Sequence, residues 1–325
     1  MQQIDKNTFF EITQNFDYVP FMQSQGWWAY HSTKDENRFV FFVDSQEKPT
    51  LACMGFIMKR FGLKLLIIDG ECLSDKKNID SKNIREFYRE ITRTGFDMIE
   101  VNSSLPYDAL YEIGIRQAGY LRPAGLFSTP LTILIDFRKP IEYDKNWKKN
   151  LHKASKYQLN FLHIPLPNEK DVTDYFAMNK EMSSRKHLVN VLSVYGLKKL
   201  LMDKHFELFF VENEEKKRIA GEITYSRNNT STSIYAVNSP EGRKKAAAYF
   251  RYLKIYNFYK ERGGHFFDCG RITPAAHKKN DIFLFKNGVK GDYLLYCGEW
   301  SWYKKQIFRP LMYFVKKYLF KKVEV

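Results

Sequence analysis

The residues EGRKKAAAYFRYLKIYNFYKERGGHFFDCGRITPAAHKKNDIFLFKNGVKG, numbers 241–291, carry the clearest structural pattern in this sequence. We expect a long helix at about 242–262, because Gly263-Gly264 follows it and glycine commonly ends helices. A short strand follows at 265–268, and it breaks at Cys269-Gly270-Arg271. A helix leading into a strand that ends in polar residues places them at the carboxyl edge of a sheet. Open α/β sheets bind their ligands at that edge.

Outside this stretch, strand and helix periods alternate along the whole chain, which predicts a mixed α/β fold. We expect strands at 38–44, 51–59, 64–69, 97–102, 132–137, 159–164, 207–212, 217–226, 230–237 and 292–298, and helices at 81–94, 106–118, 145–156, 169–184 and 193–203.

The length of 325 residues is enough for two domains of ordinary size. Pro140 interrupts the pattern, so we expect domains at 1–140 and 141–300, followed by a C-terminal segment at 301–325. The second half runs helix, helix, three-strand meander, helix, strand, which is the order of a GNAT-type acyltransferase domain. The first half fits that order less closely.

The composition limits the cellular setting of the protein. The net charge of +15 and the isoelectric point near 9.4 favour phosphates, anionic lipids or nucleic acid as partners. No basic and apolar leader opens the chain, and no apolar run approaches membrane-spanning length. We therefore expect a cytoplasmic protein, soluble or peripheral at the inner face of the membrane. The cysteines lack zinc spacing, so we expect free thiols and no metal.

The 241–291 stretch resembles the FemABX-like transferases, which are tandem GNAT-like proteins. In that family a strand ends in an Asp-x-Gly-like element, and Phe-Lys-x-Gly-x-x-Gly follows. Arg271 departs from the pattern, since many members have a small residue there. The resemblance implies two GNAT-like acyltransferase domains in mixed α/β sheets. The matching residues here are Asp268, Gly270, Phe285, Lys286, Gly288 and Gly291.

Two further segments resemble the same family. Residues 21–27, FMQSQGW, look like its Gln-Ser-x-x-Trp element. The resemblance implies that Trp27 and the residue four positions later contact the substrate. That residue is a phosphate-binding Lys in characterised relatives and His31 here. Trp27 in the core is the alternative. The Arg that contacts substrate phosphate in relatives corresponds to Arg185, and the alternative is a cation that stabilises a helix end. Arg271 completes the substrate-binding candidates.

The donor site is expected on basic segments of the second half. Residues 147–154, WKKNLHKA, resemble the family's basic helix, and Lys149 and Lys153 suit a polyanion such as tRNA, or else form a solvated face. Acetyl-CoA-binding domains carry a glycine pair at the position of 238–246. Gly242, Arg243 and Lys244 remain as donor-binding candidates, but the glycine pair is missing. The segment favours aminoacyl-tRNA, which FemABX relatives use, over CoA.

An activated ester or thioester needs no covalent nucleophile, because an amine attacks it directly. Asp268 is a candidate base or amine-orienting group, with hydrogen bonding to the following turn as the alternative. Lys286 is a candidate for neutralising a phosphate or the oxyanion, with an ordinary surface lysine as the alternative. Cys269 has no evident His and Asn partners as a nucleophile.

The C-terminal segment 308–322 has the pattern of a basic amphipathic helix. Leu311, Phe314, Val315, Tyr318 and Leu319 form one apolar stripe. The stripe either docks onto the protein's own domain or lies on an anionic membrane surface.

Together these patterns indicate a FemABX-like acyltransferase or aminoacyltransferase. It would N-acylate an amine of a cell-envelope precursor, such as one of peptidoglycan, with no tightly bound cofactor. One alternative is an acyl-CoA-dependent enzyme acting on an amino sugar of an exported polysaccharide. Another is a non-catalytic membrane- or nucleic-acid-binding protein of the same fold. The sequence leaves the acyl group, the acceptor and the oligomeric state open.

Overall fold

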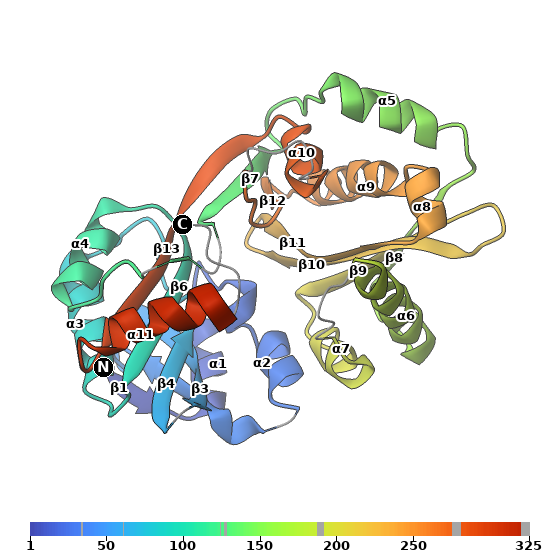
Figure 1. The fold of residues 1–325 in the computed structure, drawn as a ribbon. Coiled ribbons are helices and arrows are strands. Elements are labelled where there is room, and N and C mark those ends of the chain that lie inside the picture. Colours follow the sequence, from blue (N-terminus) through green and yellow to red (C-terminus); the bar gives the residue numbers. More distant parts are fainter. Residues whose placement is uncertain are drawn as a thin grey trace. The chain divides into compact units, whose positions relative to one another are not determined.

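A computed structural model of the chain divides into two compact units (Figure 1). It describes residues 1–33, 35–60, 62–123, 125–126, 129–186, 192–274 and 281–319. The first unit contains Met1–Trp28, Lys34–Leu131 and Leu294–Val325, and the second contains Ala29–Thr33 and Thr132–Tyr293.

The sheet of the first unit has the strand order β1-β2-β3-β4-β6-β13, with β5 paired to β3. Three of its helices, α1, α3 and α4, begin after aspartates: Asp5, Asp80 and Asp108 each accept hydrogen bonds from backbone N–H groups of the first turn. The elements are β1 (Gln2–Ile4), α1 (Lys6–Thr13), α2 (Gln25–His31), β2 (Phe39–Val43), β3 (Leu51–Arg60), β4 (Leu63–Ile68), β5 (Cys72–Leu73), α3 (Ser81–Thr92), β6 (Met98–Pro106), α4 (Ala109–Gln117), β13 (Asp292–Tyr303), α11 (Phe308–Phe314) and η3 (Val315–Leu319), with short 3-10 turns at Phe21–Gln23 and Glu36–Arg38.

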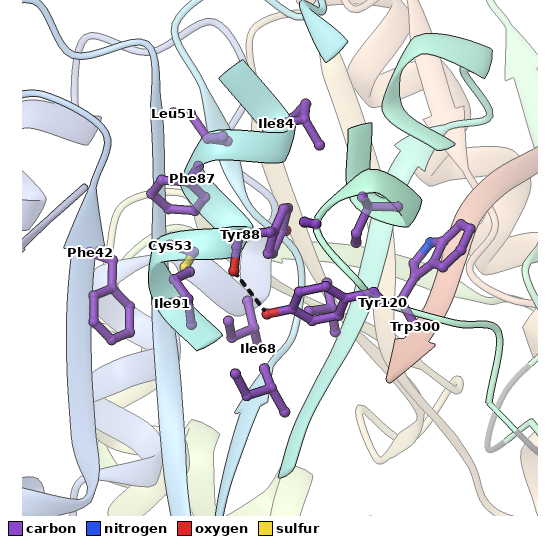
Figure 2. Close-up of a cluster of buried hydrophobic side chains, with 14 of the residues drawn as sticks. Phe42, Leu51, Cys53, Ile68, Ile84, Phe87, Tyr88, Ile91, Tyr120 and Trp300 are labelled. Atoms are coloured by element: carbon purple, nitrogen blue, oxygen red, sulfur yellow. Dashed lines mark hydrogen bonds between the residues drawn. The ribbon is translucent and has the colours of Figure 1, made fainter. Parts of the chain in front are cut away.

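Alternate residues of these strands face two different apolar layers, as the strand period of two requires. Leu66 of β4 and Ile99 of β6 belong to the large cluster that α3 and α4 cover. Leu65 and Met98, one position earlier, face α11 on the other side of the sheet. Figure 2 shows part of the large cluster, in which the Tyr120 hydroxyl donates to the Tyr88 backbone oxygen at 3.4 Å.

The sheet of the second unit has the strand order β7-β12-β11-β10-β9-β8. Asn228 and Asn229 make the tight turn between β10 and β11 with φ of 47° and 62°, a region that asparagine tolerates better than most residues. The elements are β7 (Leu131–Asp136), α5 (Lys145–Ala154), β8 (Asn160–Ile164), α6 (Glu169–Arg185), α7 (Val194–Leu200), β9 (Phe206–Glu212), β10 (Arg218–Arg227), β11 (Thr230–Asn238), α8 (Pro240–Lys244), α9 (Ala247–Glu261), β12 (Phe266–Asp268) and α10 (Asp281–Asn287).

The two units repeat one topology. Each has an antiparallel three-strand meander, β2-β3-β4 in the first and β9-β10-β11 in the second. In each, a helix follows the meander, and the next strand returns parallel to the third meander strand. An antiparallel strand then pairs with that returning strand, β13 in the first unit and β7 in the second. Each unit therefore takes this strand from the sequence of the other half, which explains why the first half alone fits the GNAT order less closely.

Three local expectations need correction. The helix expected at 242–262 is broken at Ala246, whose φ of 55° lies in the left-handed region, so α8 and α9 are separate. The motif after the β12 strand forms α10, which was not expected as a helix. The last strand runs to Tyr303, beyond the expected end at 298. The compact units divide between Leu131 and Thr132 and between Tyr293 and Leu294, and the domain bounds 1–140, 141–300 and 301–325 stay a prediction.

No helix in the described part of the chain combines the length and apolarity needed to cross a bilayer.

Candidate functional site

Strands β11 and β12 of the second unit part where β12 ends, after the third residue of β11. The parallel pairing covers Thr230 to Thr232 of β11, and its last pair is Thr232 with Asp268. β11 then continues to Asn238. Beyond the last pair, the Tyr235 carbonyl accepts the Tyr175 hydroxyl at 2.7 Å, and the Val237 carbonyl accepts Arg251 Nη1 at 2.9 Å. Side chains thus satisfy backbone groups that a neighbouring strand would otherwise pair.

Asp268 lies at the point where the strands part. Its buried Oδ1 accepts a hydrogen bond from Thr132 Oγ1 at 2.5 Å and one from the Gly270 N–H at 2.8 Å. Gly270 has a φ of 76°, a conformation that glycine adopts without the strain other residues incur. Asp268 therefore holds the turn that follows the strand, which was one of the two roles expected for it.

Lys286, from the last turn of α10, reaches the same turn. Its Nζ donates to the carbonyls of Gly270 and Arg271, at 3.2 Å each. Burial lowers the pKa of Lys286, while the nearby Cys269 and Asp268 act in the opposite direction. The structure therefore brings Asp268 and Lys286 together on Gly270, and Lys286 is not an ordinary surface lysine.

Trp147 fixes the position of α10. Its indole is fully buried, and Nε1 donates to the Phe285 carbonyl at 2.6 Å. A Cβ on Gly288 would lie 2.3 Å from Trp147 Cδ1, and a Cβ on Gly291 would lie 2.7 Å from the Leu134 carbonyl oxygen. The glycines of the Phe-Lys-x-Gly-x-x-Gly pattern thus permit the close packing that holds Lys286 in place.

Cys269 does not have the character of a nucleophile. Its thiol is buried, and burial raises its pKa to about 12. Reactive cysteines need a lowered pKa, because the thiolate is the attacking species. This agrees with the expectation from the sequence.

A buried ion pair lies beside the turn, and the sequence reasoning missed it. Arg251 Nε donates to Glu222 Oε2 at 2.7 Å, and both side chains are almost fully buried. Ser233 donates to the other Glu222 oxygen and lies 3.1 Å from the Tyr252 hydroxyl. The available signal was one acid inside the apolar strand Arg218–Arg227 and one arginine inside the aromatic-rich helix Ala247–Glu261.

Arg185 lies at the other end of the exposed stretch of β11. Its Nη2 donates to the Asn238 carbonyl at 3.0 Å, while Nε and Nη1 have no hydrogen-bond acceptor among the residues that the structure describes. Asn238 is six residues beyond Thr232. At about 3.3 Å per residue this is roughly 20 Å from the Asp268 turn.

The residues expected to hold the donor lie beside Asn238. Gly242 packs tightly, since a Cβ there would lie 2.3 Å from both Asn238 Oδ1 and the Ile219 carbonyl oxygen. This glycine is explained by close packing of α8 on β10. Glu241 accepts from Asn213 Nδ2 at 2.7 Å and pairs with Lys245 at 3.1 Å.

The side chains of Arg243 and Lys244 are exposed beside this segment. Lys149 and Lys153 are also exposed, on α5, whose Trp147 packs against Tyr249 of α9. None of these cations forms an ion pair within the described ranges. They leave a basic surface on this unit.

Trp27 and His31 belong to different units. Trp27 packs edge-on against Phe21, with ring centroids 5.0 Å apart, beside an apolar cluster of the first unit. Trp27 is half-buried at this position, and its role in substrate binding stays a prediction. His31 is exposed at the end of α2 and meets Tyr30 edge-on at 4.7 Å. Tyr30 itself packs against Gly196 in the second unit.

The corresponding region of the first unit is closed. There β4 pairs with β6 to its last residue, Ile68 with Val101. Just beyond, the fully buried Glu71 accepts from the Tyr88 hydroxyl at 3.0 Å and from Ser103 Oγ at 2.6 Å. Burial raises the Glu71 pKa to about 7, and hydrogen bonds from these hydroxyls partly oppose the shift.

Comparison with known proteins identifies the fold. No family model and no curated protein matches the sequence. Among solved structures, FemX matches 96% of this chain and 100% of its own length, with a TM-score of 0.76 and 11% identity. L-PGS from Bacillus licheniformis matches 98% and 97%, with a TM-score of 0.63 and 13% identity.

A third solved structure has the same fold. The C-terminal domain of a putative lysylphosphatidylglycerol synthetase from Agrobacterium fabrum matches 83% of this chain and 85% of its own, with a TM-score of 0.56 and 12% identity. These likenesses confirm the expected mixed α/β fold of the FemABX type.

Proposed function

We propose that this protein is a transferase that moves an activated acyl or aminoacyl group onto an amine of a cell-envelope component. The observation that carries the proposal is the convergence of Asp268 and Lys286 on Gly270, where β11 and β12 part, in a chain with the FemX fold. A polar site at the carboxyl end of strands is where such sheets bind ligands.

The reaction needs alignment and charge stabilisation. The amine nitrogen attacks the acyl carbon, and a C–N bond forms as the carbonyl oxygen becomes an oxyanion. The oxyanion then collapses, the bond to the donor oxygen breaks, and the amine proton ends on that leaving oxygen. The Lys286 ammonium is the group to face the oxyanion, while Asp268 keeps the Gly270 turn in place and orients the amine.

Aminoacyl-tRNA is the donor we favour. The second unit has exposed cations on α5 and after Gly242, and they offer a surface for a polyanion. They are Lys149, Lys153, Arg243 and Lys244. Gly242 is explained by packing against Ile219, and Glu241 adds a negative charge to the same turn. Both observations argue against a CoA pyrophosphate at α8.

The acceptor is an amine of an envelope precursor, with peptidoglycan as the first choice because FemX shares the fold. Arg185 stays a candidate for a phosphate-bearing acceptor through the resemblance alone, because its guanidinium donates to the Asn238 carbonyl at 3.0 Å and lies 3.9 Å from the Glu181 carboxylate. Trp27 and His31 stay candidates for the same substrate, and so does Arg271.

The test is mass spectrometry of envelope precursors from a strain that lacks the chain, complemented with wild type, Lys286→Met or Lys260→Met. Lys260 is an exposed lysine on α9 and serves as the matched control. We expect one acyl or aminoacyl mass to disappear in the deletion strain, to return with wild type and Lys260→Met, and to stay absent with Lys286→Met. An unchanged precursor profile in the deletion strain would refute the envelope acceptor. Full rescue by Lys286→Met would favour a non-catalytic binder.

Binding experiments separate the donors. We expect charged tRNA to bind with an affinity that falls steeply with salt, and Lys149→Glu with Lys153→Glu to weaken it. The control, Lys77→Glu with Lys82→Glu, changes two exposed lysines of the first unit and should leave binding unchanged. A CoA thioester at 100 times its dissociation constant would instead add about 2.7 kcal/mol of stability. That shift, without tRNA binding, would favour the acyl-CoA alternative.

A further inference from the structure

The C-terminal helix of the first unit turns an apolar face away from the domain. Ile307, Leu311, Phe314 and Tyr318 expose 69%, 47%, 56% and 61% of their surface. Their spacing of four, three and four residues places them along one side of α11 and η3. We call these four residues the outer stripe. The rings of Phe314 and Tyr318 stack, with centroids 5.9 Å apart and planes within 14°.

A different set of residues docks the helix. Phe308 and Met312 pack against the cluster of Leu65, Met98 and Tyr303. Lys316, four residues after Met312, is buried as well: its Nζ lies 3.3 Å from Glu100 Oε2 on β6. Figure 1 shows α11 lying across this sheet. Three members of the expected stripe, Leu311, Phe314 and Tyr318, therefore face outward, while the docking face contains a lysine.

The buried ion pair holds this orientation. Rolling the helix to cover the outer stripe would withdraw Lys316 and leave the Glu100 carboxylate buried without its cation. Removing one partner from a buried ion pair is strongly destabilising. The outer stripe is thus kept exposed by a specific contact, in a soluble domain where contiguous apolar surface of this kind marks an interaction site.

Cations border the outer stripe. Lys305 and Lys317 are exposed, and the ammonium of Lys317 lies 5.5 Å from the Tyr313 ring and 5.6 Å from the Tyr318 ring. An apolar face with aromatic residues and flanking lysines is the pattern of helices that lie in the interface of an anionic bilayer. A second copy on the same face would bring like charges together, which disfavours self-association.

We infer that α11 and η3 form a membrane-binding surface, with the outer stripe inserted among the lipids of an anionic bilayer and Lys305 and Lys317 at the phosphate level. This inference is independent of the transferase proposal, because the binding involves only the first unit. It would hold the protein at the surface where lipid-linked compounds are found.

The test is co-sedimentation of the full chain with vesicles of phosphatidylglycerol and phosphatidylcholine in equal parts, and with vesicles of phosphatidylcholine alone. We expect binding to the mixed vesicles that weakens as salt is raised. Leu311→Glu with Phe314→Glu should lower the partition coefficient by about tenfold or more, because two inserted side chains become charged.

The matched control is Leu166→Glu with Met202→Glu, which replaces side chains that are 89% and 72% exposed in the second unit. This variant should bind within about twofold of wild type, because neither residue lies in the interfacial helix. Melting temperatures measured alongside show that each variant is folded.

Three outcomes would overturn the inference. One is a wild-type chain that stays in the supernatant with anionic vesicles. Another is a stripe variant that binds as well as wild type. The last is a wild-type dimer that becomes monomeric in the stripe variant, which would make a second copy the occupant of the surface.

Discussion

The two units share one topology but differ where the parallel strand pair ends. In the first unit β4 pairs with β6 to its last residue, and the buried carboxyl group of Glu71, whose pKa burial raises to about 7, lies beyond it. In the second unit β11 continues past its last pair with β12, and Lys286 and Asp268 meet there. The repeat thus supplies the same frame twice, and the two copies differ in how far the parallel strand pair extends.

The buried carboxylates show the same contrast. Glu222 of the second unit is paired with Arg251 at 2.7 Å, whereas Glu71 receives hydrogen bonds from hydroxyls of Tyr88 and Ser103. Burial raises the pKa of Glu71 to about 7, and the hydrogen bonds from the hydroxyls only partly oppose that rise. The second unit therefore has a buried ion pair beside the turn after β12, whereas in the first unit the carboxyl group beyond the strand pair has hydroxyl partners.

Arg251→Met tests the contrast between the two buried carboxyl groups, and we expect it to have the largest effect of the variants described here. It leaves the Glu222 carboxylate buried without its cation, so the free energy of unfolding should fall by about 3–5 kcal/mol. Urea denaturation at neutral pH measures the change. The control Arg93→Met breaks the exposed pair with Glu90, and it should cost less than about 1 kcal/mol. Equal losses of unfolding free energy in the two variants would show that the buried pair stabilises the fold no more than an exposed pair does.

Glu71→Gln tests the first unit through the pH dependence of its stability. The folded-state pKa of Glu71 is raised from 4.5 to about 7, so the folded chain binds more protons than the unfolded chain between these values. Stability present below about pH 4.5 is therefore lost as the pH rises through about 7, and the loss is on the order of 3 kcal/mol.

The Gln variant keeps a neutral side chain at every pH and should lack this dependence. Denaturant midpoints measured across the window, for wild type and variant, check the expectation. Parallel curves for the two proteins would show that Glu71 does not titrate there.

Lys286→Met sharpens the assignment of the site to the second unit. Removing the ammonium should lower the transfer rate about a hundredfold, as removal of one oxyanion-stabilising group does. Tyr111→Phe is the counterpart on α4, the helix that corresponds to α10, and removes a hydroxyl 3.3 Å from that of Tyr88. It should leave the rate within about threefold, because β4 stays paired with β6 to its last residue and the Asp268–Lys286 turn lies in the other unit. If Tyr111→Phe lowered the transfer rate more than Lys286→Met did, the active site would be assigned to the first unit instead.

Thr132→Val gives the smallest expected effect. It removes the hydroxyl that donates to Asp268 at 2.5 Å and lies 2.9 Å from the Gly270 carbonyl. The loss of a buried hydrogen bond should destabilise the chain by about 1–2 kcal/mol. Thermal unfolding measures it, with Thr92→Val on the exposed surface of α3 as control. No difference between the variants would mean that Thr132 does not hold the turn.

The local elements could be predicted because they depend on short-range rules. The meander at 207–237, the helix after Asp80 and the helix after Asn168 follow from alternating apolar residues and from capping side chains. The break at Ala246 could not be predicted, because no glycine or proline marks it. The helix α10 was also missed, since it is short and its position depends on Trp147.

The residues of the candidate site also fall into those that the sequence could predict and those that it could not. Asp268 and Lys286 could be named from a motif, and the structure places both on one turn. Glu222 and Arg251 were missed because no motif marks the one acid of β10 or the one arginine of α9, and only packing brings them into contact. Trp27 was named from a motif, and it packs beside an apolar cluster of the first unit.

The sequence by itself determined the α/β character, the GNAT-like order of the second half, the excess of positive charge and the residues that could carry chemistry. Each of these depends on composition or on neighbours along the chain. Only the tertiary structure decided that each unit takes one strand from the other half of the sequence and that β11 continues beyond its last pair with β12. It also decided that the C-terminal helix docks with Lys316 buried. These features arise from contacts between residues far apart in the chain, where burial and the pairing of charges outweigh local propensity.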